Sequence, residues 1–193
     1  MTSDEPSKRF KNYAPSIIKI YDRDGHVLLE ETSLVAVSVK AGKEYGIVAL
    51  GNEVAENLEL FDMNSPAAKA AREEALRDPR LKRYWKDIAR DDFIVDITVG
   101  SPLRNGVIAE VGLSHRMFRY FLTKTKVLGW FVKPCIAVCA PVEMTEVESM
   151  ALTNVMLTAG TRDVLIFEKL YREVAHEIPR KYKATIEIVP NDA

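Results

Sequence analysis

Apolar and polar positions along this chain follow two periods, one typical of strands and one typical of helices. From residue 93 onward, short apolar runs alternate with stretches whose apolar residues recur every three or four positions. This alternation favours an α/β fold, in which helices cover a mixed sheet that contains parallel neighbours. In this half we expect strands over 93–99, 107–111, 135–140, 164–167 and 184–189, and helices over 114–126, 145–160 and 168–177.

Before residue 61 the pattern is that of four short strands and one short helix. The turn Asp22-Arg-Asp-Gly25 separates the first two strands, and its Asp-Gly pair tolerates the positive φ of a hairpin. Residues 1–15 are polar and contain two prolines, so we expect a flexible arm before a single domain over 16–193. The strands are expected over 17–21, 26–30, 34–39 and 45–50, as a four-strand meander, and the helix over 51–60.

Two helices of the second half have well-defined starts. Ser114 is a candidate N-cap, and Leu113 with Phe118 would form a hydrophobic staple. Thr145-Glu-Val-Glu148 has the sequence of a capping box, in which the threonine and the second glutamate each bond the other's backbone N–H. This helix is expected to end at Gly160.

Residues 61–92 change character and predict a helical insertion. Ser65-Pro66 supplies an N-cap and a first-turn proline, and Asp78-Pro79 starts a second helix. That second helix carries one apolar stripe. We favour the interpretation that the stripe packs on the parent domain, and the alternative is that it forms a partner-binding face. The stripe consists of Leu81, Tyr84, Trp85 and Ile88.

The composition excludes several classes of function. Lysine and arginine (27) nearly balance aspartate and glutamate (28) among 193 residues, so we expect no nucleic-acid partner. No apolar run approaches the roughly 20 residues of a membrane-spanning helix, and the polar start contains no signal-peptide core. The expected location is therefore the cytoplasm.

Cysteines and histidines predict neither a disulfide nor a metal site. Cys135 and Cys139 lie on one strand, where their Cα atoms would be about 13 Å apart, beyond the roughly 7 Å limit for a disulfide. We expect both to be small buried apolar residues. His26, His115 and His176 are scattered, without a cysteine or carboxylate at ligand spacing, and we interpret them as surface residues.

Glycine positions argue against a nucleotide cofactor. The nine glycines include no Gly-x-Gly pair, whereas a phosphate-binding loop needs glycines so that backbone N–H groups can converge on the anion. We therefore expect no cofactor. The carboxylate pairs Glu146/Glu148 and Asp91/Asp92 are explained by a capping box and a charged turn without catalysis.

From about residue 17 to 177, the order of motifs resembles the first large subdomain of MreB/Mbl-type bacterial actin-like proteins. The most specific stretch is Pro102-Leu-Arg-Asn-Gly-Val-Ile-Ala-Glu110, which is similar to the family's "RPLKDGVIAD". Val138-Cys-Ala-Pro141, Thr145-Glu-Val-Glu148 and the stretch from Ala159 to Glu168 are similar to "VCVP", "TEVE" and "AGA-x-x-V-x-L-I-E". The resemblance implies an actin-like, RNase-H-like fold, with the helical insertion in place of the small variable subdomain.

Departures from the family pattern change the function that the resemblance implies. The family's phosphate loops, Asp-x-Gly-Thr and Asp-x-Gly-Gly-Gly-Thr, have no counterpart before residue 17 or after Ile186. Glu168 aligns near the family's water-activating residue, but without a phosphate to attack we expect no catalytic role. We therefore expect a non-enzymatic cytoskeletal or scaffolding protein that joins or regulates a cell-shape filament of full-length relatives, or self-associates. The alternatives are an ATPase or phosphotransferase completed by a second chain, and a relic domain with a new ligand.

The apolar stretch 127–132 lies where the resembling family has a membrane-inserting loop. Leu128, Trp130 and Phe131, with lysines nearby, would suit peripheral contact with the inner face of the membrane. Folding of Trp130 and Phe131 back onto the core is the equally weighted alternative.

The strand over 184–189 is expected to fill a central slot in the sheet. In the family, the first strand lies between the meander and the strand equivalent to 135–140, and no segment before residue 17 resembles it. An empty slot would leave backbone groups unpaired, at about 1–3 kcal/mol each. We therefore expect 184–189 to insert beside 135–140, from the same chain or from a neighbouring copy.

Overall fold

The computed structural model describes residues 15–40, 43–61, 96–129 and 131–191. These residues belong to two compact units, one within 34–100 and the other made of 13–33 and 101–193. The expected arm at 1–15 and insertion at 61–92 lie almost entirely outside the described residues. Their boundaries, like the single domain over 16–193, stay predictions.

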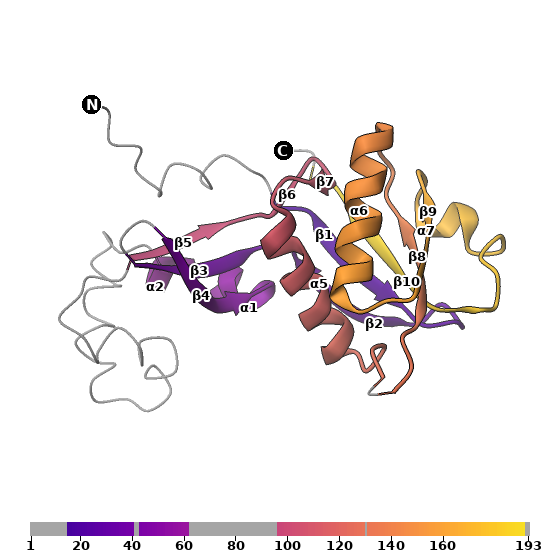
Figure 1. Cartoon of the computed structure of the whole chain (residues 1–193), viewed down its shortest axis with the longest axis horizontal. Coiled ribbons are helices and arrows are strands. Elements are labelled where there is room, and N and C mark those ends of the chain that lie inside the picture. The colour runs from indigo at the N-terminus through magenta and orange to yellow at the C-terminus, as the bar shows by residue number, and fades with distance from the viewer. Residues whose placement is uncertain (1–14, 41–42, 62–95, 130, 192–193) are drawn as a thin grey trace. The chain divides into compact units, whose positions relative to one another are not determined.

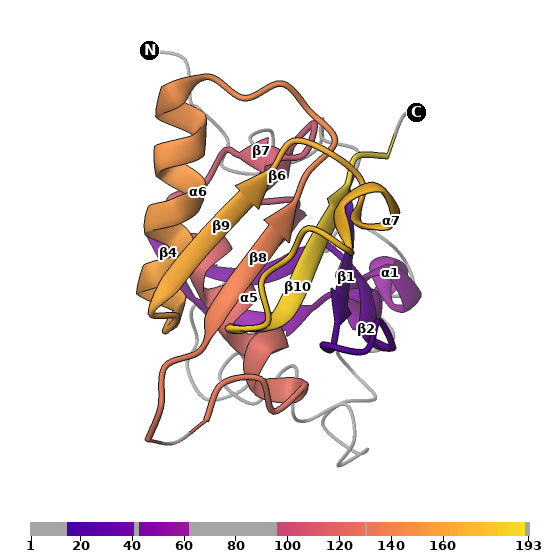
Figure 2. The same cartoon turned by 90° about the vertical axis from the view of Figure 1, so that its right-hand side faces the viewer.

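The larger unit is built on a five-stranded sheet of order β2-β1-β10-β8-β9 (Figures 1 and 2). Strands β8 and β9 are parallel and joined through α6, as a crossover between parallel strands requires. The bounds are β1 Ile17–Tyr21, β2 Val27–Thr32, β8 Cys135–Cys139, β9 Asp163–Phe167, β10 Tyr182–Val189, α5 Val111–Lys124, α6 Glu146–Ala159 and α7 Tyr171–Val174.

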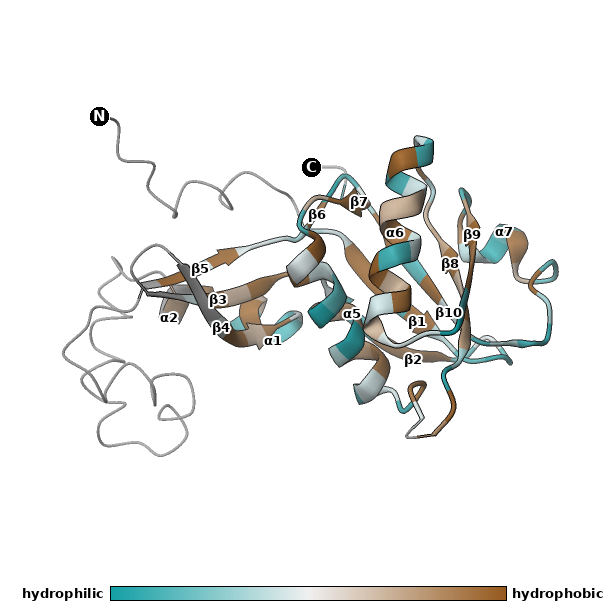
Figure 3. Ribbon diagram, viewed as in Figure 1, coloured by the Kyte–Doolittle hydropathy of each residue, from teal (hydrophilic) through white to brown (hydrophobic). Residues whose placement is uncertain are grey.

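Strand β10 confirms the expected central insertion, and it comes from the same chain. It pairs antiparallel with β1 on one side and parallel with β8 on the other. Every residue of β8 is buried, which explains why its sequence is continuously apolar. Figure 3 colours the strands of this sheet largely brown, as expected for a sheet covered on its faces.

One face of the sheet carries the main core of this unit. Helices α5 and α6 pack against each other on this face, and α7 lies on the opposite face (Figures 1 and 2). Burying each such apolar side chain contributes about 1.5–3 kcal/mol. The fully buried members include Ile18, Ile20, Met117, Phe118, Phe121, Leu122, Ile136, Val138, Val155, Met156, Ile186 and Ile188.

The smaller unit is a three-stranded sheet of order β4-β3-β5 with two short helices. Its core contains Leu34, Ala36, Ala49, Val54, Phe61 and Ile97. The bounds are β3 Val35–Lys40, β4 Lys43–Leu50, α1 Asn52–Glu56, α2 Leu58–Phe61 and β5 Asp96–Gly100.

The predicted four-strand meander is wrong, because the first four strands belong to two sheets. The chain leaves the larger unit after Ser33, whose backbone N–H donates to the Ser16 carbonyl, and whose hydroxyl accepts from the Ser16 N–H. Hydrogen-bond pairing then continues from β3 to β4 and β5 rather than back to β2. Local periodicity cannot distinguish these two pairings, since each strand keeps the same apolar pattern in either one.

Helix α5 begins three residues before the predicted cap. Its N-cap is Glu110, without a side-chain cap, and the Ser114 hydroxyl instead donates to the Pro102 carbonyl at 3.2 Å. The expected staple is therefore wrong. Two other elements are shorter than expected: the strand over 107–111 is β7 Val107–Ile108, paired with β6 Leu103–Arg104, and the helix over 168–177 is α7.

The capping box and the Gly160 terminus of α6 are confirmed. The Thr145 hydroxyl accepts from the Glu148 N–H, while the Glu148 carboxylate accepts from the Thr145 N–H at 2.8 Å. Gly160 has φ 119°, a conformation that residues with a Cβ rarely adopt. The turn at Gly25, with φ 86°, is confirmed as well.

Candidate functional site

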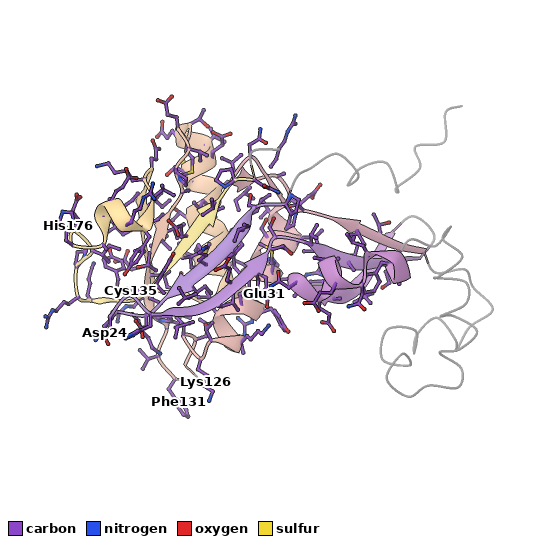
Figure 4. The ribbon with its side chains drawn as sticks, turned by 180° about the vertical axis from the view of Figure 1, so that it is seen from behind. Asp24, Glu31, Lys126, Phe131, Cys135 and His176 are labelled. Atoms are coloured by element: carbon purple, nitrogen blue, oxygen red, sulfur yellow. The ribbon has the colours of Figure 1, made fainter. Side chains whose placement is uncertain are left out.

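The segment after α5 carries the most exposed large apolar side chain of the described residues, and a second one stands beside it. Phe131 is 96% exposed and Val132 69% exposed. In Figure 4, Phe131 projects away from the body of the unit, beside Lys126. The membrane or partner contact expected of Leu128, Trp130 and Phe131 stays a prediction, and Trp130 lies outside the described residues. We call Phe131 and Val132 the apolar tip.

The base of this segment is fixed to the unit. Val127 is buried, and its carbonyl accepts from Lys183 Nζ at 2.9 Å. Leu128 is half-buried and lies against the end of α6, since a Cβ at Gly160 would come within 3.4 Å of its Cδ2. At the other end, the Pro134 carbonyl accepts from the Arg162 N–H at 2.8 Å. The apolar tip therefore lies between two anchored ends.

Lysines surround the base of the apolar tip. Lys126 follows α5, and Lys133 is exposed directly after the tip. Lys124, in the last turn of α5, donates to the Glu31 carboxylate at 2.6 Å. The Glu31 charge offsets that of Lys124, whereas Lys126 and Lys133 belong to the same segment as the tip and Lys183 reaches its base from β10.

Helix α6 has a second apolar surface on its exposed side. Val147, Met150 and Leu157 are 76%, 58% and 39% exposed. Their spacing of three and seven residues places them on one side of the helix. The opposite side carries Leu152 and Val155, which are buried. A helix with apolar residues on both sides is usually covered on both, so this α6 face suits contact with another protein.

A buried carboxylate lies on the α7 side of the sheet. Glu187 of β10 accepts from the Tyr21 hydroxyl at 2.7 Å and from the Tyr171 N–H at 2.8 Å. The two tyrosine rings stack with their centroids 4.0 Å apart. Burial, and secondarily the Glu187 charge, raises the pKa of the neighbouring Cys139 thiol to about 12, so that this cysteine is unreactive at neutral pH.

A pocket of about 390 Å³ opens beside α7, lined in part by Tyr171, Arg180 and Thr185. At its rim, the β1–β2 turn places side chains of Asp22, Asp24 and His26 within 4.8 Å of one another. The expectation that no carboxylate stands at ligand spacing from a histidine is therefore wrong for His26, and the spacing of two residues within a tight turn could have indicated the cluster. The Asp22 carboxylate already accepts from the N–H groups of Asp24 and His26, which explains the geometry as a turn.

The structure places the other predicted residues as follows. The stripe of Leu81, Tyr84, Trp85 and Ile88 lies outside the described residues. Cys135 and Cys139 are free and buried, as expected. Glu168 is exposed and precedes α7 instead of standing in its first turn. Its carboxylate accepts from the Met144 N–H at 3.4 Å. In the described part of the chain, no helix is both long and apolar enough to span a membrane.

Comparison with known proteins agrees with these motifs. Residues 94–175 match the family model described as MreB/Mbl protein. The resemblance to the MreB/Mbl family is confirmed. The cell shape-determining protein Mbl of Bacillus cereus is 35% identical over 68 residues, and MreB of Haemophilus influenzae is 33% identical over 70. Each alignment covers 35% of this chain and 20% of the relative, so the MreB/Mbl-like chain spans about a fifth of these relatives.

The fold has an actin-like neighbour among solved structures. MreB 5 of Spiroplasma citri, in its complex with AMPPNP, superposes with a TM-score of 0.53 at 20% identity. The superposition covers 79% of this chain and 35% of that one. The predicted actin-like α/β class is therefore confirmed at the level of the fold.

Proposed function

We propose that this chain is a non-catalytic, actin-like cytoskeletal or scaffolding protein that joins or regulates a cell-shape filament. The observation that carries this proposal is the exposed apolar face of α6. The relatives with matching sequence are named as cell shape-determining proteins. We propose that the occupant of the face is a second copy of this chain or a full-length relative, in the cytoplasm.

Charge substitutions on the α6 face test this proposal. Val147→Glu with Met150→Glu should lower self-association by at least about tenfold, because each buried contact would then desolvate a carboxylate. Thr123→Glu, at an exposed position of α5, adds one carboxylate to a different helix and serves as the control for introduced negative charge. Sedimentation velocity over a concentration series measures the effect. If the wild type, the double variant and Thr123→Glu associate equally, both alone and when mixed with a purified full-length relative, the α6 face is not the contact surface.

Peripheral contact with the inner face of the membrane is a second proposed function, which the exposed apolar tip supports. Phe131→Ser with Val132→Ser should abolish co-sedimentation with liposomes, since these are the side chains that would enter the interfacial zone. The control is Tyr120→Ser, which removes an exposed aromatic residue from α5. Unchanged sedimentation of the double variant, or none by the wild type, would rule out this contact.

The proposed lack of catalysis concerns nucleotide above all. The central strand β10 ends at Val189. Pro190 follows it and packs close to Gly106, since a Cβ added at Gly106 would lie 3.1 Å from the Pro190 ring. Because the nine glycines of the sequence form no Gly-x-Gly pair that could hold a phosphate, we expect no heat of binding when ATP and magnesium are titrated into the protein. Turnover abolished by Glu168→Gln would support instead the alternative of an ATPase or phosphotransferase completed by a second chain. Binding of another small molecule in the pocket beside α7 would support the relic with a new ligand.

A further inference from the structure

The end of α5 has the hydrogen bonds of a Schellman motif. The Val127 N–H donates to the Leu122 carbonyl at 3.0 Å, and the Lys126 N–H donates to the Thr123 carbonyl at 3.0 Å. Val127 and Leu122 are both buried, which supplies the apolar contact of that motif. Lys126 has φ 58°, where glycine is the usual residue. The apolar tip therefore follows a strained turn that must be held by its surroundings.

Lys183, in strand β10, stabilises this turn through hydrogen bonds. Its ammonium group donates to the carbonyls of Val127 and Lys126, at 2.9 and 3.4 Å. These carbonyls lie just past the negative end of the α5 dipole, where a cation is favoured. Lys183 belongs to β10, the central strand, so this contact ties the base of the tip to the middle of the sheet.

The chain beyond the base is also constrained. The Pro134 carbonyl is bonded to the Arg162 N–H, and a Cβ at Gly129 would lie 3.5 Å from the Val132 carbonyl. The tip therefore folds back closely between its two anchors. A preformed apolar tip loses less conformational entropy on insertion than a flexible one, and so binds more tightly for the same buried area.

We propose that Lys183 is a positioning residue that holds the apolar tip of Phe131 and Val132 ready to insert into an anionic lipid surface. This inference rests on the membrane contact put forward under Proposed function. Lys126 and Lys133 flank the tip, and their charge complements anionic headgroups rather than neutral ones. Lys183 acts differently, because its ammonium group is directed to backbone carbonyls.

The two roles of lysine are separable with vesicles of neutral phosphatidylcholine and vesicles that also contain phosphatidylglycerol. Lys183→Met keeps the aliphatic stem and should weaken binding by about 2- to 10-fold on both kinds of vesicle, the cost of ordering one or two side chains. Lys133→Met should weaken binding by about fivefold on anionic vesicles and leave neutral vesicles unaffected. Lys183→Arg, which retains the donors, should restore most of the affinity.

Amide hydrogen exchange of the same variants, measured without lipid, reports whether Lys183 holds the base of the apolar tip in place. Lys183→Met should speed exchange of the Lys126, Val127 and Leu128 amides, all of which are bonded to carbonyls of the last turn of α5. Unchanged exchange would overturn the positioning role, as would faster exchange with unchanged vesicle binding. Failure of the wild type to bind either vesicle would refute the membrane contact itself, whatever the exchange shows.

Discussion

Ile186 of β10 stands in parallel register with Val138 of β8, and both side chains are completely buried. On the other side of β10, Ile186 is the antiparallel partner of Ile20. The central strand of the larger unit is thus the last strand of the chain described here. Its removal would separate the two halves of the sheet.

We expect deletion of residues 184–193 to unfold the larger unit. The deletion removes two rows of ladder hydrogen bonds, and each buried backbone group left unpaired costs about 1–3 kcal/mol. Ile186→Ala is the milder test and should lower the free energy of unfolding by about 2–5 kcal/mol. Urea denaturation measures both, with exposed Thr158→Ala as a control that should stay within about 0.5 kcal/mol. An unaltered midpoint in the truncated protein would contradict the central role of β10.

Two glycine-to-alanine substitutions should have opposite effects. Gly160→Ala should destabilise the protein by about 1–2 kcal/mol, because the residue has φ 119° and its Cβ would approach Leu128 and Arg119 at 3.4 Å. Gly112→Ala, within α5, should stabilise it by about 0.4–1 kcal/mol, because a Cβ there meets nothing within 4 Å. Thermal unfolding of the two variants provides the comparison. Stabilisation by Gly160→Ala would show that the terminus of α6 is not strained as described, and destabilisation by Gly112→Ala would contradict the open space at that position.

The Tyr21 hydroxyl should make stability depend on alkaline pH. Burial first, and then the hydrogen bond to Glu187, raises the pKa of Tyr21 well above its ordinary value of 10.0. The folded state thus favours the neutral phenol, so this contribution is complete below about pH 10 and is lost as the pH rises toward the folded-state pKa.

Tyr21→Phe should reduce that alkaline loss of stability and cost about 1–3 kcal/mol at neutral pH through the lost bond to a carboxylate. Tyr120→Phe, on the exposed side of α5, is the matched control. Unfolding by urea at neutral and alkaline pH measures both variants. An identical pH profile for Tyr21→Phe and the wild type would disprove the assignment.

The capping box of α6 predicts a dependence on acidic pH. The backbone N–H of Thr145, and then its hydroxyl, lower the pKa of Glu148 below its ordinary value of 4.5. Because the pKa is lower in the folded state, this stabilisation is present above about pH 4.5 and is lost as the pH falls through the folded-state value. Glu148→Gln should therefore lower stability at neutral pH and narrow the difference between neutral and acidic pH. Glu146→Gln, the control, removes a charge from the same turn but leaves the capping box intact. If Glu146→Gln narrows the difference in stability between neutral and acidic pH as much as Glu148→Gln does, Glu148 has no specific role.

Local signals of the sequence predicted some elements correctly, for identifiable reasons. The Thr145-Glu148 capping box and Gly160 define the ends of α6 because their hydrogen bonds and backbone angles involve residues only a few positions apart. The apolar run of β8 predicted a strand buried on both faces, since such a strand has no solvent-facing side to mark with polar residues.

The sequence by itself thus determined the α/β class, most elements of the larger unit, the MreB/Mbl resemblance and, through the need to fill a slot, the position of β10. The tertiary structure alone decided that the first four strands divide between two sheets, that α5 begins at Val111 and that Lys183 reaches the base of the apolar tip. These features depend on residues far apart in the chain, such as Lys183 and Val127. Periodicity and capping motifs describe neighbours within one element, and therefore carry no information about which distant backbone groups an element will meet.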